Sequence, residues 1–336
     1  MKKYNVAILG ATGAVGREII KILQERKFPI NELRLLASSK SIGEKIQFNN
    51  ETLFVQEANE NSFDNIDIVL SAVSNSISKK LLPFAVKAGA VVVDNSSAYR
   101  LDDDVPLVVP EINSEDVKNH KGIIANPNCS TIIGLVAVNE LNKYSRINRM
   151  IVSTYQAVSG AGSEGISELE GQVKDIVNDE EVKINTFPYQ IAYNLIPQIG
   201  DFDENGYSQE EMKLQNEGRK ILHNKDLKIN CTCVRVPVYR SHSESITIET
   251  EEEISPEKAR ELLKKAKGVK LIDDPQNKHY PMPLFASDQD LIFVGRIRKD
   301  ISCENSLSLW CSGDQIRKGA ATNAVQIAEL LIFENK

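Results

Sequence analysis

Apolar positions in the N-terminal part of the chain form short runs separated by segments of helical spacing. Residues 4–9 (YNVAIL) make a run typical of a buried strand, and Ile19, Ile20 and Leu23 follow at helical spacing. Further strands are predicted at Leu33–Ser38, Thr52–Gln56, Asp67–Val73, Ala90–Ser96, Pro106–Ile112 and Gly122–Asn126, and a helix is predicted to end at Gly89. Strands that alternate with amphipathic helices favour an α/β fold, here a Rossmann-like doubly wound parallel sheet covered on both faces.

From about Met150 the pattern changes to longer strands, several with period-two alternation. These strand-like segments are MIVSTYQAVSG, CTCVRVPVY, ESITIETEEE, DLIFVGRIR and SLSLWCSG. Helices are predicted in EGISELEGQVKDIVND and SQEEMKLQNEGRKIL, and another from a Ser255 cap and Pro256 to just before Gly268. The chain closes with a long amphipathic helix, QIRKGAATNAVQIAELLIFE. This half therefore predicts a mixed α+β domain with helices on one face of its sheet.

The length of 336 residues suits two domains, because single cores rarely grow beyond about 250–300 residues. We expect a cofactor-binding domain over residues 1–129, completed by the closing helix over 314–336. Residues 130–313 would form a substrate-binding and dimerisation domain. The long apolar strands there favour a buried dimer interface, although a covered sheet face within one subunit would give the same pattern.

Charge and composition exclude several classes of function. The 40 basic and 47 acidic residues give a net charge of −7, which disfavours nonspecific binding to nucleic acid. No apolar run approaches the roughly 20 residues that span a bilayer, and the N-terminus lacks the apolar core of a signal peptide, so we expect a cytoplasmic protein without membrane association. The cysteines have no disulfide-framework or zinc-ligand spacing, so no metal site is expected.

Three glycines, Gly10, Gly13 and Gly16, lie between the first strand and the first helix. There the backbone can turn sharply and approach a pyrophosphate, whose charge is favoured by the free N–H groups of the helix start. A plain turn would also use glycine, but this position favours a dinucleotide site.

After the second strand, residues 37–41 (ASSKS) offer hydroxyls and a cation where NAD-binding proteins carry an acid. We therefore predict NADP, with an exposed polar loop as the alternative.

Cys129 is the candidate nucleophile. An isolated cysteine is more often a small buried residue. However, Cys129 follows Pro127 and Asn128 and opens the helical run STIIGLVAV, and a helix N-terminus stabilises a thiolate. The other cysteines fall in strand-like runs and are predicted to pack in the protein interior.

His242, at the junction of two strands, is the candidate acid or base, by elimination among four histidines.

A set of longer motifs occurs in order along the whole chain: GATGAVG, VVVDNSSAYR, VPLVVPEIN, ANPNCST, IVSTYQAVSGAG, EEMK, RVPVYRSHSES, FVGRIRKD and KGAATNAVQIAE. Together they resemble the bacterial aspartate-β-semialdehyde dehydrogenases, and NPNCST and QAVSGAG are the most specific. The resemblance implies NADPH-dependent reductive dephosphorylation of L-aspartyl 4-phosphate to L-aspartate 4-semialdehyde. It places this reaction in the biosynthesis of lysine, threonine, methionine and diaminopimelate, in a homodimer or homotetramer.

The resemblance also implies roles for single residues. Cys129 would form a thioacyl intermediate, His242 would act as acid and base, and Gln156 would orient the substrate. Arg235 and Glu210 would bind the substrate's carboxylate and amino groups, and Arg100 and Lys213 would hold phosphate. The residues expected to line the NADP site are Gly10, Thr12, Gly13, Ala14, Val15, Lys40, Ser41, Ser159, Gly160 and Asn323. Related sequences often carry Arg where this chain has Lys40, which cannot bind a phosphate in a fork, so strict NADP preference stays open.

Other functions share parts of this pattern. An N-acetyl-γ-glutamyl-phosphate reductase or a malonyl-CoA reductase would use the same thiol and dinucleotide site on another substrate. Glu210 favours a free amino group over an acetylated one. A non-catalytic NADP-binding regulator would not need Cys129, Gln156, Arg235 and His242 together. A Rossmann-type dehydrogenase in which Cys129 only packs and hydride passes directly to a ketone is the remaining alternative, and a thioacyl adduct trapped on Cys129 would exclude it.

Overall fold

The computed structural model describes residues 2–333, and the chain divides into two compact units. Unit 1 comprises Met1–Asn128 and Ala320–Lys336, and unit 2 comprises Cys129–Gly319. Within residues 2–333 no helix combines the length and the apolar character needed to cross a membrane.

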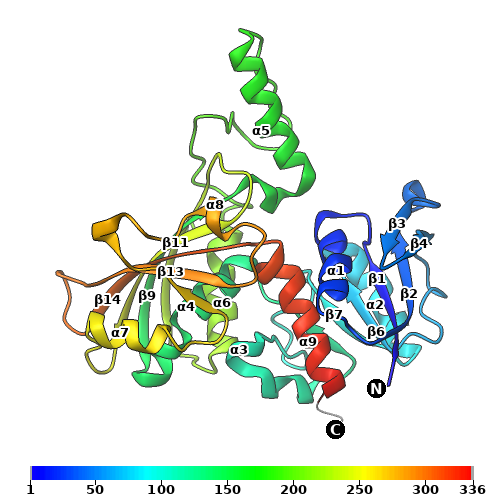
Figure 1. Cartoon of the computed structure of the whole chain (residues 1–336), viewed down its shortest axis with the longest axis horizontal. Coiled ribbons are helices and arrows are strands. Elements are labelled where there is room, and N and C mark those ends of the chain that lie inside the picture. The colour runs from blue at the N-terminus through cyan, green and yellow to red at the C-terminus, as the bar shows by residue number, and fades with distance from the viewer. Residues whose placement is uncertain (1, 334–336) are drawn as a thin grey trace. The chain divides into compact units, whose positions relative to one another are not determined.

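The described part of unit 1 contains a six-stranded sheet in the order β5-β2-β1-β6-β7-β8, and every neighbouring pair is parallel (Figure 1). Its strands are β1 (Tyr4–Leu9), β2 (Ile30–Ala37), β5 (Gln56–Glu57), β6 (Ile68–Ser71), β7 (Val91–Asp94) and β8 (Ile123–Ala125). The strand order changes direction between β1 and β6. In open parallel sheets, ligands bind outside the carboxyl ends of the strands at such a switch point.

Helices cover both faces of this sheet because its strands are apolar on both sides. Val6 and Ile8 of β1 belong to a cluster with α1 (Ala14–Glu25) and α9 (Thr322–Phe333). Ala7 and Leu9 face the opposite side, in a cluster with α2 (Asn75–Lys87). The smaller elements of the unit are η1 (Ser39–Ser41), the hairpin β3 (Lys45–Phe48) and β4 (Glu51–Phe54), and η2 (Ser114–Asn119). The predicted doubly wound parallel sheet is confirmed.

The predicted strand over Pro106–Ile112 is wrong. Only Leu107 pairs, in an isolated bridge to Ala125, and the chain then forms the short helix α3 (Pro110–Asn113). Pro110 favours this because it lacks the N–H that a strand would use and fits the first turn of a helix. The Asn113 side chain completes the turn, since it accepts from the Val109 N–H at 2.9 Å.

Unit 2 contains, in its described residues, a six-stranded mixed sheet in the order β10-β9-β11-β14-β13-β12. Its strands are β9 (Ile147–Gln156), β10 (Lys228–Arg235), β11 (His242–Thr250), β12 (Val269–Leu271), β13 (Ile292–Lys299) and β14 (Ser306–Gly313). The central pairs β9–β11, β11–β14 and β14–β13 are antiparallel, and the outer pairs β10–β9 and β12–β13 are parallel. The predicted mixed α+β character is confirmed.

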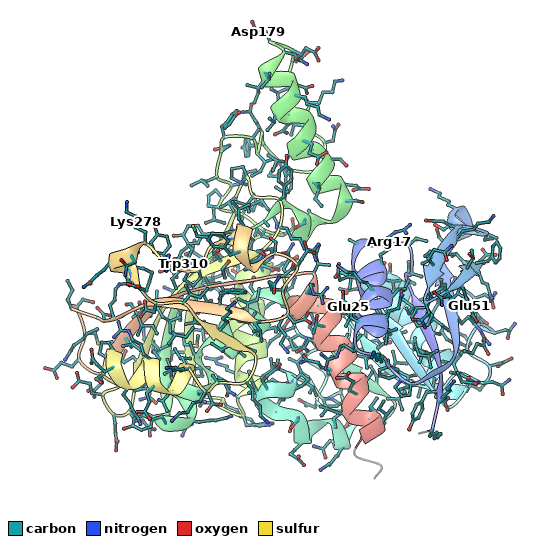
Figure 2. The ribbon with its side chains drawn as sticks, viewed as in Figure 1. Arg17, Glu25, Glu51, Asp179, Lys278 and Trp310 are labelled. Carbon is teal, nitrogen blue, oxygen red and sulfur yellow. The ribbon has the colours of Figure 1, made fainter. Side chains whose placement is uncertain are left out.

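The helices of unit 2 that contact the sheet are α4 (Cys129–Tyr144), α6 (Gln209–Ile221), α7 (Pro256–Leu263) and α8 (Pro283–Ala286). The helix α5 (Gly162–Val177), followed at its far end by Asp179 (Figure 2), packs with the loop after it around Leu169, Phe187 and Ile191. The remaining elements are η3 (Val158–Ala161), η4 (Pro275–Asn277) and the π-helical η5 (Arg317–Ala321).

Two predicted helix limits in the second half need correction. The helix capped by Ser255 ends at Leu263, so Gly268 lies in a later turn, where its φ is +75°. The closing α-helix begins only at Thr322, because residues 317–321 form the π-helical turn instead. The predicted end of this helix at residue 336 lies outside the described residues.

Candidate active site

Cys129 is the first residue of α4 and is half-buried. Pro127 ends the preceding segment, and the apolar run that follows makes α4 an almost wholly buried helix against β9, β11, β13 and β14. The thiol is therefore fixed at a helix N-terminus, as the sequence predicts. Gly319 lies beside it, and a Cβ on Gly319 would lie 2.9 Å from the Cβ of Cys129. The absence of a side chain at Gly319 keeps space next to the thiol.

Three polar side chains lie at strand ends on one edge of the sheet of unit 2. Gln156 ends β9, Arg235 ends β10, and the two are paired in register. His242 begins the antiparallel strand β11, whose next residue, Ser243, pairs with Tyr155 of β9. Because β10 runs parallel to β9 and β11 runs antiparallel to it, the ends of β9 and β10 and the start of β11 lie at the same edge of the sheet. This brings together Gln156, Arg235 and His242, which are far apart in the sequence.

Glu210 enters the same group from α6. Ser208 caps this helix through a capping box with Glu211, which fixes the first turn. The Gln156 amide then donates to Glu210 Oε1 at 3.1 Å, and Lys213 Nζ lies 3.0 Å from Glu210 Oε2. Glu210 and Lys213 therefore share one face of α6, as their i,i+3 spacing predicts. Thr154 Oγ1 donates to Gln156 Oε1 at 3.2 Å and orients the amide.

Arg235 is buried, with only 7% of its surface exposed. Its Nη1 donates to the Ala157 carbonyl at 2.7 Å, and its guanidinium lies over the ring of Phe187. Burial lowers the pKa of Arg235, while the negative charges of Glu210 and of a Cys129 thiolate act in the opposite direction. The guanidinium therefore interacts electrostatically with the sulfur at the start of α4.

His242 is completely buried, and its two ring nitrogens have different surroundings. The Ala157 backbone N–H donates to Nδ1 at 3.0 Å, so Nδ1 carries no proton. Burial lowers the pKa of the ring to about 3, the positive charge of Arg235 adds to this, and Glu210 opposes it. A neutral ring with an acceptor at Nδ1 carries its proton on Nε2, which has no hydrogen-bond partner among the described residues. The ring therefore offers one donor, Nε2–H, to a ligand.

Ser159 and Gly160, which the sequence assigned to the NADP site, lie within unit 2 on η3. A Cβ on Gly160 would come 2.7 Å from Arg235 Nη1 and 3.4 Å from His242 Nε2. A side chain at position 160 would therefore displace the Arg235 guanidinium from its present position. Ser159 Oγ accepts from the Gln315 amide.

The remaining cysteines differ in their surroundings. Cys231, Cys233 and Cys311 are buried, as predicted, whereas Cys303 is exposed in the turn between β13 and β14, so its predicted packing role is wrong. The side-chain hydrogen bond with Cys233, followed by burial, raises the pKa of Cys231, and burial raises that of Cys311. Among the buried cysteines, Cys231 and Cys311 are therefore poor nucleophiles.

In unit 1 the glycine loop follows β1, as predicted. Gly10 has φ +91°, and a Cβ there would lie 2.4 Å from the Ala72 carbonyl oxygen. No side chain caps the N-terminus of α1 at Gly13, so the backbone of Ala14 and Val15 begins the helix with N–H groups that can bind an anion. A cavity of about 900 Å³ lies at this edge, with Gly10, Thr12, Ser38 and Ser39 in its lining. These features fit the pyrophosphate and adenosine of a dinucleotide.

The other predicted residues of unit 1 form two groups. Ser41 Oγ of η1 lies 3.4 Å from Thr12 Oγ1, and Lys40 lies on the same turn. Arg100 is buried and donates to the carbonyls of Asn126 at 2.9 Å and Asn95 at 2.8 Å. Asn323 donates to Asn126 Oδ1 at 2.7 Å, so Arg100 and Asn323 both hold the segment that leads into Cys129.

Some functional groups have no simple signal in the sequence. The Ala157 N–H and carbonyl are backbone groups, which the residue type does not reveal. Thr154 and Gly319 act through their place in the sheet and beside α4. Only the register of β9 and the packing of η5 could have identified them.

A parallel sheet with a glycine loop after its first strand, together with a cysteine that opens a helix and interacts electrostatically with a buried arginine, fits a dehydrogenase of the semialdehyde class. The chain accordingly matches the family model of the semialdehyde dehydrogenase NAD-binding domain over residues 5–120 and that of the semialdehyde dehydrogenase dimerisation domain over residues 139–318.

Individual relatives narrow this class. The aspartate-semialdehyde dehydrogenase of Aquifex aeolicus is 55% identical over 98% of this chain and 98% of its own. A crystal structure of aspartate semialdehyde dehydrogenase II from Vibrio cholerae, complexed with ASA, shares 45% identity and a TM-score of 0.97 over 99% of both chains. The Candida albicans enzyme, solved with NADP, shares 25% identity and a TM-score of 0.77 over 99% of both chains.

The chain belongs to the aspartate-semialdehyde dehydrogenases. It is an enzyme of amino-acid biosynthesis with aspartate-semialdehyde dehydrogenase activity, and the resemblance drawn from its motifs is confirmed.

Because His242 is neutral in the folded protein, we expect the free energy of unfolding to decrease as the pH falls. Its pKa is about 3 in the folded protein and about 6.5 when unfolded, so the unfolded chain binds the proton first as the pH falls. The stability this ring contributes is therefore complete above about pH 6.5 and is lost progressively toward pH 3, by about 1.4 kcal/mol per pH unit.

Urea unfolding at pH 7 and pH 5 measures this effect. We expect the wild-type protein to lose about 2 kcal/mol more than His242→Gln over this interval. His279→Gln, at an exposed histidine, is the matched control and should behave like the wild type. Equal losses in the wild type and His242→Gln would contradict the assignment of a neutral ring.

Proposed function

We propose that this enzyme reduces L-aspartyl 4-phosphate to L-aspartate 4-semialdehyde and phosphate with NADPH, through a thioester on Cys129. The observation that carries the proposal is the group formed within unit 2 by Cys129, His242 and Arg235 with the hydrogen-bonded pair Gln156–Glu210. The Vibrio cholerae relative complexed with ASA supports the semialdehyde as the product of this reaction.

The first half of the reaction is acyl transfer to sulfur. The Cys129 thiolate attacks the acyl carbon, a C–S bond forms, and the carbon–oxygen bond to phosphate breaks, with the electron pair leaving on phosphate. The N-terminus of α4 and the buried guanidinium of Arg235 both favour the thiolate. No base on the protein is needed in this step, because the thiolate has no proton to lose and the phosphate leaves with the electron pair of the broken carbon–oxygen bond.

The second half is reduction of the thioester. NADPH, when bound, supplies the hydride that the thioester carbon accepts. The resulting oxyanion re-forms the carbonyl, the C–S bond breaks, and the Cys129 thiolate is regenerated with the aldehyde. The protein's task in both halves is therefore to stabilise negative charge on the substrate oxygen.

His242 is suited to that task in a specific way. Its Nδ1 accepts from the Ala157 N–H, so transfer of the Nε2 proton would leave an imidazolate in a buried site. Full proton transfer from this tautomer is therefore costly, and the acid/base role that the resemblance implies narrows to hydrogen-bond donation from Nε2 to the oxyanion.

The charged side chains match an amino-acid acyl phosphate. Arg235 offers a fork to the substrate's α-carboxylate, and Glu210, hydrogen-bonded to Gln156, offers a carboxylate to its ammonium group. An acetylated amine has no positive charge to interact with Glu210, which disfavours an N-acetyl-γ-glutamyl substrate. Lys213 and Arg100 are proposed to bind the phosphate.

The cofactor site is proposed in unit 1. Gly10, Thr12 and Gly13 with the start of α1 would hold the pyrophosphate, and Lys40 and Ser41 the 2′-phosphate. Asn323, Ser159 and Gly160 are proposed to contribute on the nicotinamide side. The Candida albicans relative, solved with NADP, supports NADP as a cofactor.

The open face of the unit 2 sheet is proposed to form a homodimer. Tyr155 and Ile151 of β9 are exposed there, and Tyr155 packs on Trp310 of β14, labelled in Figure 2, with ring centres 5.3 Å apart. The face also carries small hydroxyl residues, Ser153, Ser245 and Thr247, on neighbouring strands. A flat surface of aromatic and hydroxyl side chains can pack closely against a second copy, and the match to a dimerisation domain supports this use.

Cys129→Ser tests the reaction. We expect phosphate-dependent reduction of NADP with L-aspartate 4-semialdehyde to fall by roughly 10⁴-fold or more, because the hydroxyl is a far weaker nucleophile than a thiolate. Mass spectrometry of quenched wild-type enzyme should show an aspartyl adduct on the peptide that contains Cys129. Cys303→Ser, at the exposed thiol, is the control and should retain activity. Normal turnover by Cys129→Ser would exclude the mechanism.

Tyr155→Glu tests the dimer. A charge at the centre of a packed interface is costly to bury, so we expect this variant to sediment with the mass of a single chain at concentrations where the wild type is a dimer. Phe54→Glu, at an exposed aromatic residue of unit 1, is the control and should leave the dimer intact. A Tyr155→Glu dimer as stable as the wild type would place the interface elsewhere.

A further inference from the structure

Two buried side chains of α5 hold the loop that follows this helix. Glu168 and Gln172 lie one turn apart on the same helix face and are 8% and 1% exposed. Glu168 accepts hydrogen bonds from three successive backbone N–H groups of the loop, those of Asn185 at 3.1 Å, Thr186, and Phe187 at 3.4 Å. A buried carboxylate is tolerated when such donors surround it. Glu168 therefore fixes the backbone of the loop at this point.

Gln172 attaches the loop to α5 a second time. Its amide donates to Glu168 Oε1 at 3.1 Å, which orients both side chains. Its own Oε1 accepts from the N–H groups of Ile191 at 2.9 Å and Ala192 at 3.0 Å. The position of the loop is therefore set by the helix through hydrogen bonds to its backbone.

The loop in turn contacts Arg235 in two places. The Arg235 guanidinium carbon lies 5.9 Å from the centre of the Phe187 ring. Ile196 pairs with the Arg235 backbone, because the N–H of each donates to the carbonyl of the other, at 3.0 and 2.8 Å. Gly165 of α5 leaves room for the ring, since a Cβ there would lie 3.1 Å from Phe187 Cζ. Both the backbone and the side chain of Arg235 are therefore in contact with the loop.

The contact with Phe187 sets the plane of the Arg235 guanidinium. Its Nη1 donates to the Ala157 carbonyl at 2.7 Å, but one hydrogen bond leaves the group free to turn about that bond. An aromatic face attracts a cation placed over it and so restricts this rotation. Two parallel N–H groups reach a carboxylate together only when the plane is correctly oriented. The orientation of the fork therefore depends on Phe187 and, through the loop, on Glu168.

We propose that Glu168 is a positioning residue for substrate binding: it holds the loop so that Phe187 orients the Arg235 guanidinium toward the substrate's α-carboxylate. This inference rests on the proposed use of Arg235 as the carboxylate-binding residue. It gives α5, which lies outside the proposed catalytic group, a part in substrate affinity.

Steady-state kinetics of phosphate-dependent semialdehyde oxidation test the proposal. Glu168→Gln keeps the size of the side chain but replaces one acceptor oxygen by a donor that faces N–H groups. We expect KM for L-aspartate 4-semialdehyde to rise roughly tenfold, with kcat and KM for phosphate within about twofold of the wild type, because Arg235 binds the carboxylate equally in the ground and transition states. Glu170→Gln, at an exposed glutamate of the same helix, is the control and should match the wild type.

A double-mutant cycle separates positioning from a general structural role. Phe187→Leu removes the aromatic face and should also raise KM for the semialdehyde. We expect the variant that combines Glu168→Gln with Phe187→Leu to have the KM of Phe187→Leu alone, because both substitutions act through the same contact. Effects on KM that multiply, or a fall in kcat with an unchanged KM, would overturn the proposal.

Proton–nitrogen NMR of the Arg235 side chain measures its orientation without turnover. The Nε–H signal, assigned by its absence in Arg235→Lys, should shift in Glu168→Gln and in Phe187→Leu, because the ring current of Phe187 acts on it. A shift in both variants, without semialdehyde turnover by the wild type, would contradict the proposed reaction and leave Glu168 as the residue that positions Arg235. An unchanged signal in Glu168→Gln, with normal turnover, would contradict the role of Glu168 alone.

Discussion

The hydrogen bond from the Ala157 backbone N–H to His242 Nδ1 is the constraint on which the proposed catalytic group depends. It joins the end of β9 to the start of β11 and fixes both the ring's orientation and its tautomer. Because the ring is completely buried beside Arg235, it stays neutral, and its remaining proton lies on Nε2. One backbone group thus converts a residue that usually exchanges protons into a fixed hydrogen-bond donor. Gly160 leaves the space that the Arg235 guanidinium occupies, and a Cβ there would also lie 3.4 Å from His242 Nε2.

The other contacts of the site offset the free-energy cost of burying the charges of Arg235 and Glu210. Arg235 and Glu210 are each 7% exposed, and buried ions are tolerated when they are paired and hydrogen-bonded. Arg235 donates to the Ala157 carbonyl, and Glu210 accepts from Gln156 and pairs with Lys213. These groups are already held in place in the structure, so the proposed reaction would need little reorganisation when negative charge develops on the substrate oxygen. The α4 N-terminus adds a fixed favourable field at Cys129.

Local patterns in the sequence were sufficient for most regular elements and for the position of Cys129 at a helix N-terminus. The apolar runs predicted β1, β7 and β8, and the break at Pro127 before an apolar helix located Cys129. The strand predicted at Pro106–Ile112 failed because Pro110 and the Asn113 side chain favour a helical turn over an extended run. Contacts set by sheet register were not accessible: the Ala157 N–H beside His242 cannot be inferred from spacing.

Nitrogen-15 NMR of the ring of His242 tests the central claim most directly. With uniformly labelled protein and His242→Gln to assign the signals, each ring nitrogen can be observed separately between pH 5 and 9. The account predicts a protonated Nε2 and an unprotonated Nδ1 over this whole range, because the Ala157 N–H occupies Nδ1 and burial holds the pKa of the ring near about 3. A proton on Nδ1, or an imidazolium that titrates near pH 6.5, would contradict it.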